Sequence, residues 1–97
     1  MKKANIPSQF TLGGIPFQVQ RKKITLDDNR MAGAADYRNQ IVYVDAENGT
    51  IESIEQTFYH EALHCIMHIL GKYELRDDEE FIEQTSQLIY QLIKTSK

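Results

Sequence analysis

The three histidines of the chain lie within nine residues, and two of them belong to the sequence His60-Glu61-Ala62-Leu63-His64. This sequence matches the pattern HExxH, in which the two histidines are about one helical turn apart. Residues four apart on a helix differ by only ~40° of arc, so both imidazoles project from one side and can bind one Zn²⁺ ion at about 2.0–2.1 Å. The spacing therefore predicts that His60 and His64 are zinc ligands.

Glu61 follows the first of these histidines directly, and on a helix its side chain is angled away from the pair. From there it can reach a water molecule at the zinc ion but not the ion itself. Because zinc lowers the pKa of such a water, Glu61 is the candidate general base. The alternative interpretation is a surface helix whose polar edge happens to be rich in histidine.

A catalytic zinc ion needs a third protein ligand and an open position for water. The metzincin pattern would have glycine and histidine at the positions of Met67 and Leu70, so that class is excluded. On the last predicted helix, Glu79 and Glu83 flank an apolar stripe, and either can face the histidines. We favour Glu83 because Glu79 lies in the first turn, where helices fray. Alternatively, both carboxylates only complement the helix dipole.

Two more residues of the same stretch are candidates for the site. His68 is one turn beyond His64, but three histidines along ~12 Å of helix cannot all bind one ion, so we expect a polar neighbour. Cys65 lies toward the apolar side and is expected to be an inert, buried thiol. No donor for a developing oxyanion is evident, and Tyr59, Tyr90 and His68 are the candidates.

The first half of the chain, over residues 9–46, predicts strands and tight turns. Gly13-Gly14 precedes the alternating segment Ile15–Arg21, which favours a hairpin because glycine tolerates the positive φ angles of a tight turn. A second hairpin is predicted for residues 32–37 and 40–45, with its turn at Arg38-Asn39. The run Ile41–Val44 is β-branched and aromatic, which is typical of a strand buried on both faces.

The second half predicts two helices. The first spans residues 50–71, with Thr50 or Ser53 as N-cap and Gly71 as a C-cap glycine. The second spans residues 78–95 and begins with acidic residues, which the helix dipole favours there. Its predicted core-facing stripe consists of Phe81, Ile82, Leu88, Ile89, Leu92 and Ile93. The whole chain, residues 1–97, is therefore expected to form one α+β domain.

Composition and charge argue against several other classes of protein. The chain has 97 residues, 41% of them hydrophobic, and a formal net charge of −3, which disfavours nucleic acid as a partner. The single cysteine excludes an intrachain disulfide and suggests a reducing compartment. No segment approaches the ~20 apolar residues of a membrane span, and the basic N-terminus lacks the apolar run of a signal peptide. We therefore expect a cytoplasmic protein with no membrane partner.

The chain resembles the zincin-like metallopeptidases, in particular the small HExxH proteins of phages and prophages. It is similar, more distantly, to the ImmA/IrrE-like metallopeptidases, in which a glutamate on the helix after HExxH completes the zinc site. The resemblance is carried by the Gly13-Gly14 hairpin and by residues 36–41 (DYRNQI), 55–64 (EQTFYHEALH) and 79–83 (EEFIE).

This resemblance implies a minimal zincin-like fold, with two hairpins forming a small antiparallel or mixed sheet against the HExxH helix and the C-terminal helix. By the same resemblance, His60, His64 and Glu83 are the zinc ligands and Glu61 is the general base. Zincins generally bind peptides along an edge strand beside the active-site helix, so a strand of the second hairpin is the expected contact for a peptide or protein substrate.

Three hypotheses about function remain open. The first is a zinc-dependent metallopeptidase that hydrolyses peptide bonds with a water molecule activated by Glu61. The second is a non-catalytic phage-type protein in which the same site holds a structural metal ion. It is motivated by the small size of the chain and by the missing oxyanion donor. The third is an acidic binding module without metal.

Overall fold

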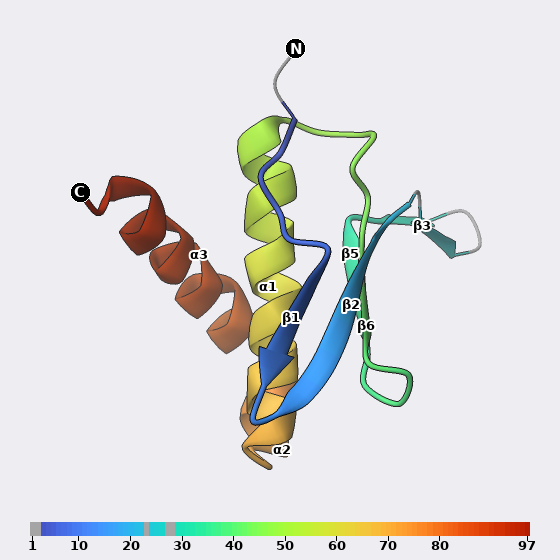
Figure 1. Ribbon diagram of the computed structural model, residues 1–97, viewed down its shortest axis with the longest axis vertical. Helices are drawn as coiled ribbons and strands as arrows, with labels where there is room; N and C mark the ends of the chain where they lie inside the picture. Colours follow the sequence, from blue (N-terminus) through green and yellow to red (C-terminus); the bar gives the residue numbers. More distant parts are fainter. Residues whose placement is uncertain (1–2, 23, 27–28) are drawn as a thin grey trace.

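The computed structural model describes residues 3–22, 24–26 and 29–97, and it has an α+β architecture as expected (Figure 1). Among these residues, no helix is both long enough and apolar enough to cross a membrane. The elements, in chain order, are β1 (Gln9–Leu12), β2 (Ile15–Arg21), β3 (Ile24–Leu26), β4 (Asn29–Met31), β5 (Gly33–Asp36), β6 (Ile41–Val44), α1 (Ile51–Ile69), α2 (Tyr73–Arg76) and α3 (Glu79–Thr95).

Both predicted hairpins are present in a four-stranded sheet of order β1-β2-β6-β5. The β1–β2 and β5–β6 pairs are antiparallel, whereas β2 and β6 run parallel, so the sheet is mixed. Gly13 and Gly14 turn the first hairpin with φ angles of 56° and 81°, which only glycine adopts readily. In this order β5 is an edge strand. Strands β3 and β4 form a separate antiparallel pair.

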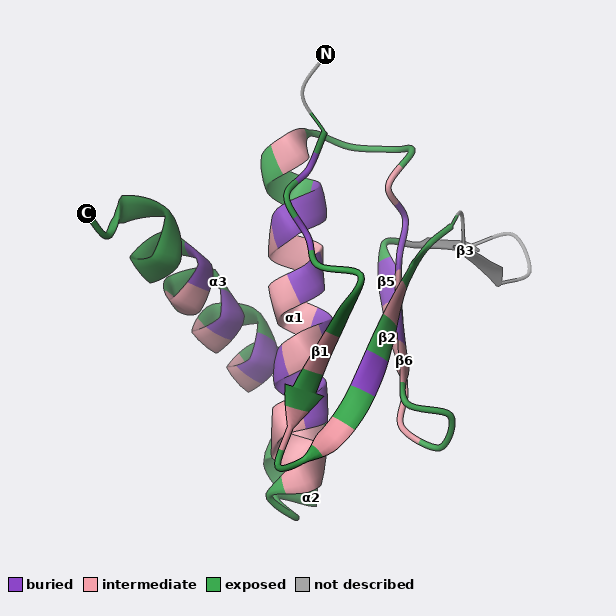
Figure 2. Ribbon diagram, viewed as in Figure 1, coloured by how far each residue is buried: buried purple, intermediate pink, exposed green. Residues whose placement is uncertain are grey.

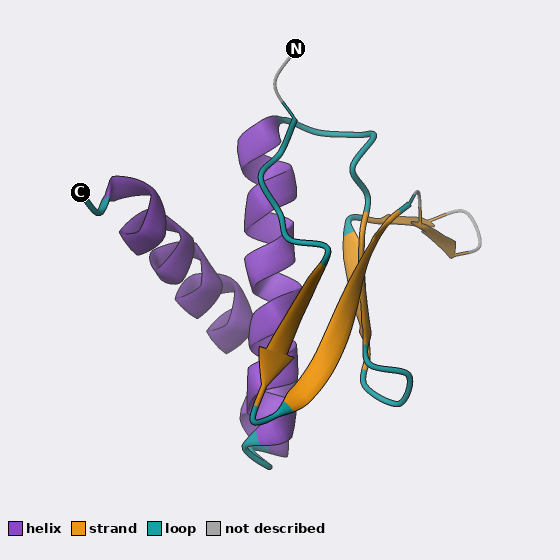
Figure 3. Cartoon of the chain, viewed as in Figure 1, coloured by secondary structure: helices purple, strands orange, loops and turns teal. Residues whose placement is uncertain are grey.

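Helix α1 packs between the sheet and α3 (Figure 3). The core lies between α1 and the sheet, where Val42 and Val44 of β6 are fully buried. Ile41 and Tyr43, on the other face of β6, are only half-buried (Figure 2). The prediction that β6 is buried on both faces is therefore correct for one face only. The buried core cluster contains Ala4, Ile6, Phe17, Val42, Val44, Ile54, Phe58 and Cys65.

The ends of α1 are set by its capping residues. Thr50, not Ser53, is the N-cap, because its hydroxyl accepts a hydrogen bond from the Ser53 amide at 3.0 Å. At the other end, Gly71 has a φ of 72°, and the amide of Lys72 donates to the Met67 carbonyl at 2.9 Å. This pattern is a Schellman C-cap, which turns the chain into α2, a short helix that the sequence did not predict.

Helix α3 buries only part of the apolar stripe that its sequence predicts, because Ile82 is buried and Phe81 and Ile89 are half-buried while the rest is exposed. Ile82, Ser86 and Tyr90 are buried, whereas Leu88 and Leu92 are 66% and 65% exposed. The buried residue Ile82 lies on the side of α3 where the Tyr90 hydroxyl bonds to Glu55 and where Glu79 and Glu83 contact His60. The face that approaches α1 is therefore the one that carries Glu79 and Glu83.

A buried glutamate ties α1 to α3 and to the N-terminal segment. The Glu55 carboxylate accepts hydrogen bonds from the Asn5 amide at 2.6 Å and from the Tyr90 hydroxyl at 2.8 Å, and Lys94 Nζ lies 3.4 Å away. Burial alone would raise the pKa of Glu55, but these three partners outweigh it and lower the pKa below the ordinary value of 4.5. The ionised form of Glu55 therefore stabilises the fold.

We expect Glu55→Gln to lower the free energy of unfolding at pH 7 by about 1–3 kcal/mol, because the amide cannot accept all of these hydrogen bonds. For a chain of this size the melting temperature falls by about 4–8 °C per kcal/mol. Because the pKa is lowered on folding, the stabilisation is complete above pH 4.5 and is lost as the pH falls through the folded-state pKa. The melting temperatures of the wild type and Glu55→Gln should converge in acid. An equal difference in melting temperature at every pH would show that the ionised carboxylate of Glu55 is not the source of the stabilisation.

Candidate metal centre

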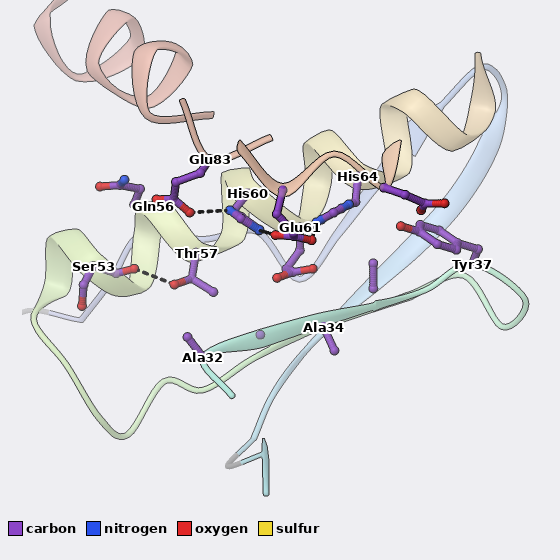
Figure 4. Close-up of a pocket in the computed structure, with 14 residues that line it drawn as sticks. Ala32, Ala34, Tyr37, Ser53, Gln56, Thr57, His60, Glu61, His64 and Glu83 are labelled. Carbon is purple, nitrogen blue, oxygen red and sulfur yellow. Dashed lines mark hydrogen bonds and ion pairs between the residues drawn. The ribbon is translucent and has the colours of Figure 1, made fainter. Parts of the chain in front are cut away.

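The metal centre predicted from HExxH lies on the side of α1 that faces α3 and β5 (Figure 4). His60 and His64 are neighbours there, with ring centroids 5.1 Å apart. Glu79 of α3 approaches both rings, with one carboxylate oxygen 3.3 Å from His60 Nε2 and the other 3.2 Å from His64 Nε2. One residue of α3 thus closes a group with the two histidines of α1.

These three residues fit the donor set of a zinc ion. Their ligand atoms all lie within 4.8 Å of one another. Two atoms that bind one tetrahedral zinc ion at about 2.0–2.2 Å are about 3.3–3.6 Å apart. Each histidine Nε2 lies close to this distance from one oxygen of the Glu79 carboxylate. Two imidazoles and one carboxylate are also the protein ligands of several catalytic zinc sites, which keep the fourth position for water.

The second nitrogen of each imidazole is held by another group. His64 Nδ1 lies 2.7 Å from the Arg76 carbonyl oxygen, which can only accept, so Nδ1 carries the proton and Nε2 is free to bind a metal. His60 Nδ1 lies 3.0 Å from a carboxylate oxygen of Glu83. Such outer partners orient a metal-binding histidine and increase its basicity.

The geometry favours Glu79 over Glu83 as the third ligand, which reverses the preference drawn from the sequence. Glu79 contacts the Nε2 atoms of both histidines, whereas Glu83 contacts only the Nδ1 atom of His60. The argument from fraying fails because Asp78 caps α3, accepting a hydrogen bond from the Phe81 amide at 3.0 Å. The first turn of α3 is therefore held in place.

Glu61, the general base predicted from the sequence, is buried and lines the same cleft as this group. Burial raises the pKa of Glu61 to about 8, and the charges of Glu79 and Glu83 act in the same direction. Strand β5 approaches closely because Gly33 has no side chain. A Cβ atom at Gly33 would lie 2.7 Å from Thr57 Cγ2 and 3.1 Å from Glu61 Cγ.

The group opens into a cleft of about 800 Å³ between α1 and β5. Figure 4 shows His60, Glu61 and His64 on one wall and Ala32, Ala34 and Tyr37 on the other. The wall along β5 consists of small residues, and at Gly33 it packs directly against α1. The cleft is lined by Ala32, Gly33, Ala34, Ala35, Tyr37, Ser53, Gln56, Thr57, His60, Glu61, His64, Asp77, Glu79 and Glu83.

A cluster around Arg76 was missed by sequence reasoning. The Arg76 guanidinium donates to His68 Nδ1 at 2.9 Å, forms two hydrogen bonds with Asp77 and lies over the rings of Tyr37 and Tyr73. His68 also stacks on Tyr37, with centroids 4.4 Å apart and planes within 3°. These residues come from the β5–β6 turn, α1 and the α2 segment, so no local sequence pattern could have joined them.

The other candidate residues, Tyr59, Cys65, His68 and Tyr90, are not among those that line the cleft. Tyr90 bonds to Glu55 and Tyr59 packs against Phe58, so neither belongs to the residues that line the cleft. His68 is a polar neighbour, as expected. Cys65 is fully buried, and burial raises the pKa of its thiol to about 12, which confirms the expected buried thiol.

Comparison of the chain with protein-family models finds no match. Comparisons with curated proteins and with solved structures likewise find no significant match. What the chain can do is therefore inferred from its motif and from the geometry of this site.

Proposed function

We propose that this protein is a zinc-dependent hydrolase that cleaves peptide bonds. One observation carries the proposal: His60, His64 and Glu79 bring ligand atoms within 4.8 Å of one another, and the buried carboxylate of Glu61 lies beside them in an open cleft. The resemblance to small zincin-like metallopeptidases supports the same reaction.

His60, His64 and Glu79 would hold the zinc ion, which would supply polarisation of the scissile carbonyl and a lowered pKa of the attacking water. In its ionised form, which the positive charge of a bound zinc ion would favour, Glu61 accepts a proton from that water as the water oxygen forms a bond to the carbonyl carbon. Glu61 then gives the proton to the amide nitrogen while the carbon–nitrogen bond breaks. Its burial excludes bulk water and keeps the carboxyl group close to the proton that it transfers.

The position of β5 supports a peptide as the substrate. It is an edge strand of the sheet and forms one wall of the cleft, so its free backbone groups can pair with an extended chain. The side chains of Ala32 and Ala34 on this wall are small, so they do not cover the cleft beside the proposed ligands on α1. The single buried cysteine fits a reducing compartment, and we place the protein in the cytoplasm.

Two measurements test this proposal: the zinc content of the purified protein and its hydrolysis of fluorescently labelled casein. We expect one zinc per chain, with hydrolysis lost on chelation and restored by zinc. His64→Asn should lose the zinc, whereas the matched variant His68→Asn should keep it. A zinc-loaded wild-type protein that leaves casein and a random peptide library intact would contradict a peptidase.

The second candidate function is a structural metal site, because the same residues join α1 to α3 in a small domain. In that case zinc would raise the melting temperature while the loaded protein cleaved no peptide. The mutational tests on Glu61 described below separate these functions.

A further inference from the structure

We propose that Tyr37 is a catalytic residue, whose hydroxyl donates a hydrogen bond to the carbonyl oxygen of the substrate as that oxygen becomes an oxyanion. This inference rests on the hydrolase proposed above. It supplies the group that the sequence left unassigned, since the reaction places negative charge on that oxygen when water adds to the carbonyl carbon.

Tyr37 stands where such a donor is needed. It is the first residue after β5, in the turn of the second hairpin, and it lines the cleft opposite His60, Glu61 and His64. In Figure 4 its hydroxyl is directed into the cleft, at the end where His64 lies. Tyr37 and Glu61 line the same cleft from opposite sides (Figure 4). A carbonyl held between the two walls therefore has the base on one side and the phenol on the other.

The Tyr37 ring is held in part by Arg76, which also contacts the proposed metal ligand His64. His68 stacks on the ring, and the Arg76 guanidinium lies 5.0 Å from its centroid. Arg76 also binds His68 through its side chain and His64 through its carbonyl oxygen. Arg76 is thus a positioning residue that contacts side chains on both walls of the cleft. These contacts hold the Tyr37 hydroxyl in place before substrate binds, as a preorganised donor requires.

The hydroxyl of Tyr37 keeps its proton in neutral solution. Its partial burial raises the pKa of Tyr37 to about 12, although the positive charge of Arg76 acts in the opposite direction. A protonated phenol can donate a hydrogen bond to an oxyanion, whereas a phenolate cannot.

The other hydroxyl and amide groups that line the cleft are less suited to this role. Thr57 donates its hydroxyl proton to the Ser53 carbonyl, and Ser53 donates its own to the Thr50 carbonyl, each at 2.9 Å. Gln56 directs its amide away from the histidines in Figure 4. Among the neutral lining side chains that can donate, Tyr37 is the one that points toward the metal ligands.

The first test compares Tyr37→Phe with the wild type, using zinc-loaded protein and labelled casein. The phenylalanine ring keeps the stack on His68, so we expect unchanged zinc content and melting temperature. The kcat should fall by about 100- to 1,000-fold with little change in KM. Tyr59→Phe is the matched control, because Tyr59 lies outside the cleft, and its kcat should equal that of the wild type. An unchanged kcat for Tyr37→Phe would overturn the proposal.

The second test uses a phosphinic dipeptide, whose tetrahedral P–O⁻ group mimics the oxyanion, and needs no turnover. Titration calorimetry on zinc-loaded protein should show about 10- to 100-fold weaker binding to Tyr37→Phe than to the wild type or Tyr59→Phe. Equal binding to all three proteins, or no binding to the wild type, would overturn the role of Tyr37. If the wild type binds the dipeptide but cleaves no peptide, the peptidase function fails separately.

Discussion

Glu61→Gln is expected to lower kcat for peptide hydrolysis by about 100- to 10,000-fold while the protein still binds one equivalent of zinc. The amide keeps the size of the side chain but cannot accept a proton, which is the contribution of a general base. The zinc ligands are unaffected because Glu61 is not one of the three residues that converge on the ion site. Steady-state kinetics on zinc-loaded protein, with zinc measured on the same sample, gives both quantities.

Glu52→Gln provides the matched control, since Glu52 is an exposed residue in the first turn of the same helix. It should leave kcat and zinc content unchanged. If Glu61→Gln kept the wild-type kcat, Glu61 would not be the base and the proposed mechanism would be wrong. If it lost zinc together with activity, Glu61 would be acting as a ligand.

The second large effect concerns the third ligand, because Glu79 and Glu83 contact different atoms of the histidines. Glu79→Gln should weaken zinc binding by more than 100-fold, since it removes an anionic ligand. Glu83→Gln removes only the partner of His60 Nδ1, and changes at such partners weaken metal binding by about 10- to 100-fold. Competition with a chromogenic zinc chelator measures both affinities.

The two glutamates serve as controls for each other, since they lie one turn apart on α3 and receive the same substitution. The opposite order of effects would mean that Glu83 binds the ion, as the sequence alone suggested. Glu80→Gln, on the polar face of the same helix, should leave the affinity unchanged.

Local features of the sequence predicted most of the fold. Gly13 and Gly14 set the first hairpin through their positive φ angles, and the pattern around Arg38-Asn39 set the second. Helix α1 followed from its apolar period and its caps. The pairing of His60 with His64 was predictable for the same reason, since it depends only on helical spacing within one element.

The rest of the site depends on how separate elements pack, which a local pattern does not contain. The apolar stripe of α3 suggested one rotation, but the face that meets α1 carries Tyr90 and Glu79 as well as Ile82, and Leu88 is left exposed. Tyr37 and Arg76 are far apart in the sequence. They meet because α2, which ends at Arg76, brings the guanidinium over the Tyr37 ring. No periodicity or spacing connects them.

The most direct test of the central claim is an anomalous difference map of crystals of the zinc-loaded protein, recorded at the zinc absorption edge. We predict one peak within about 2.0–2.2 Å of His60 Nε2, of His64 Nε2 and of a carboxylate oxygen of Glu79. Glu61 should lie beside the peak without binding it. No peak at these residues, or a peak held by other side chains, would contradict the proposed zinc site.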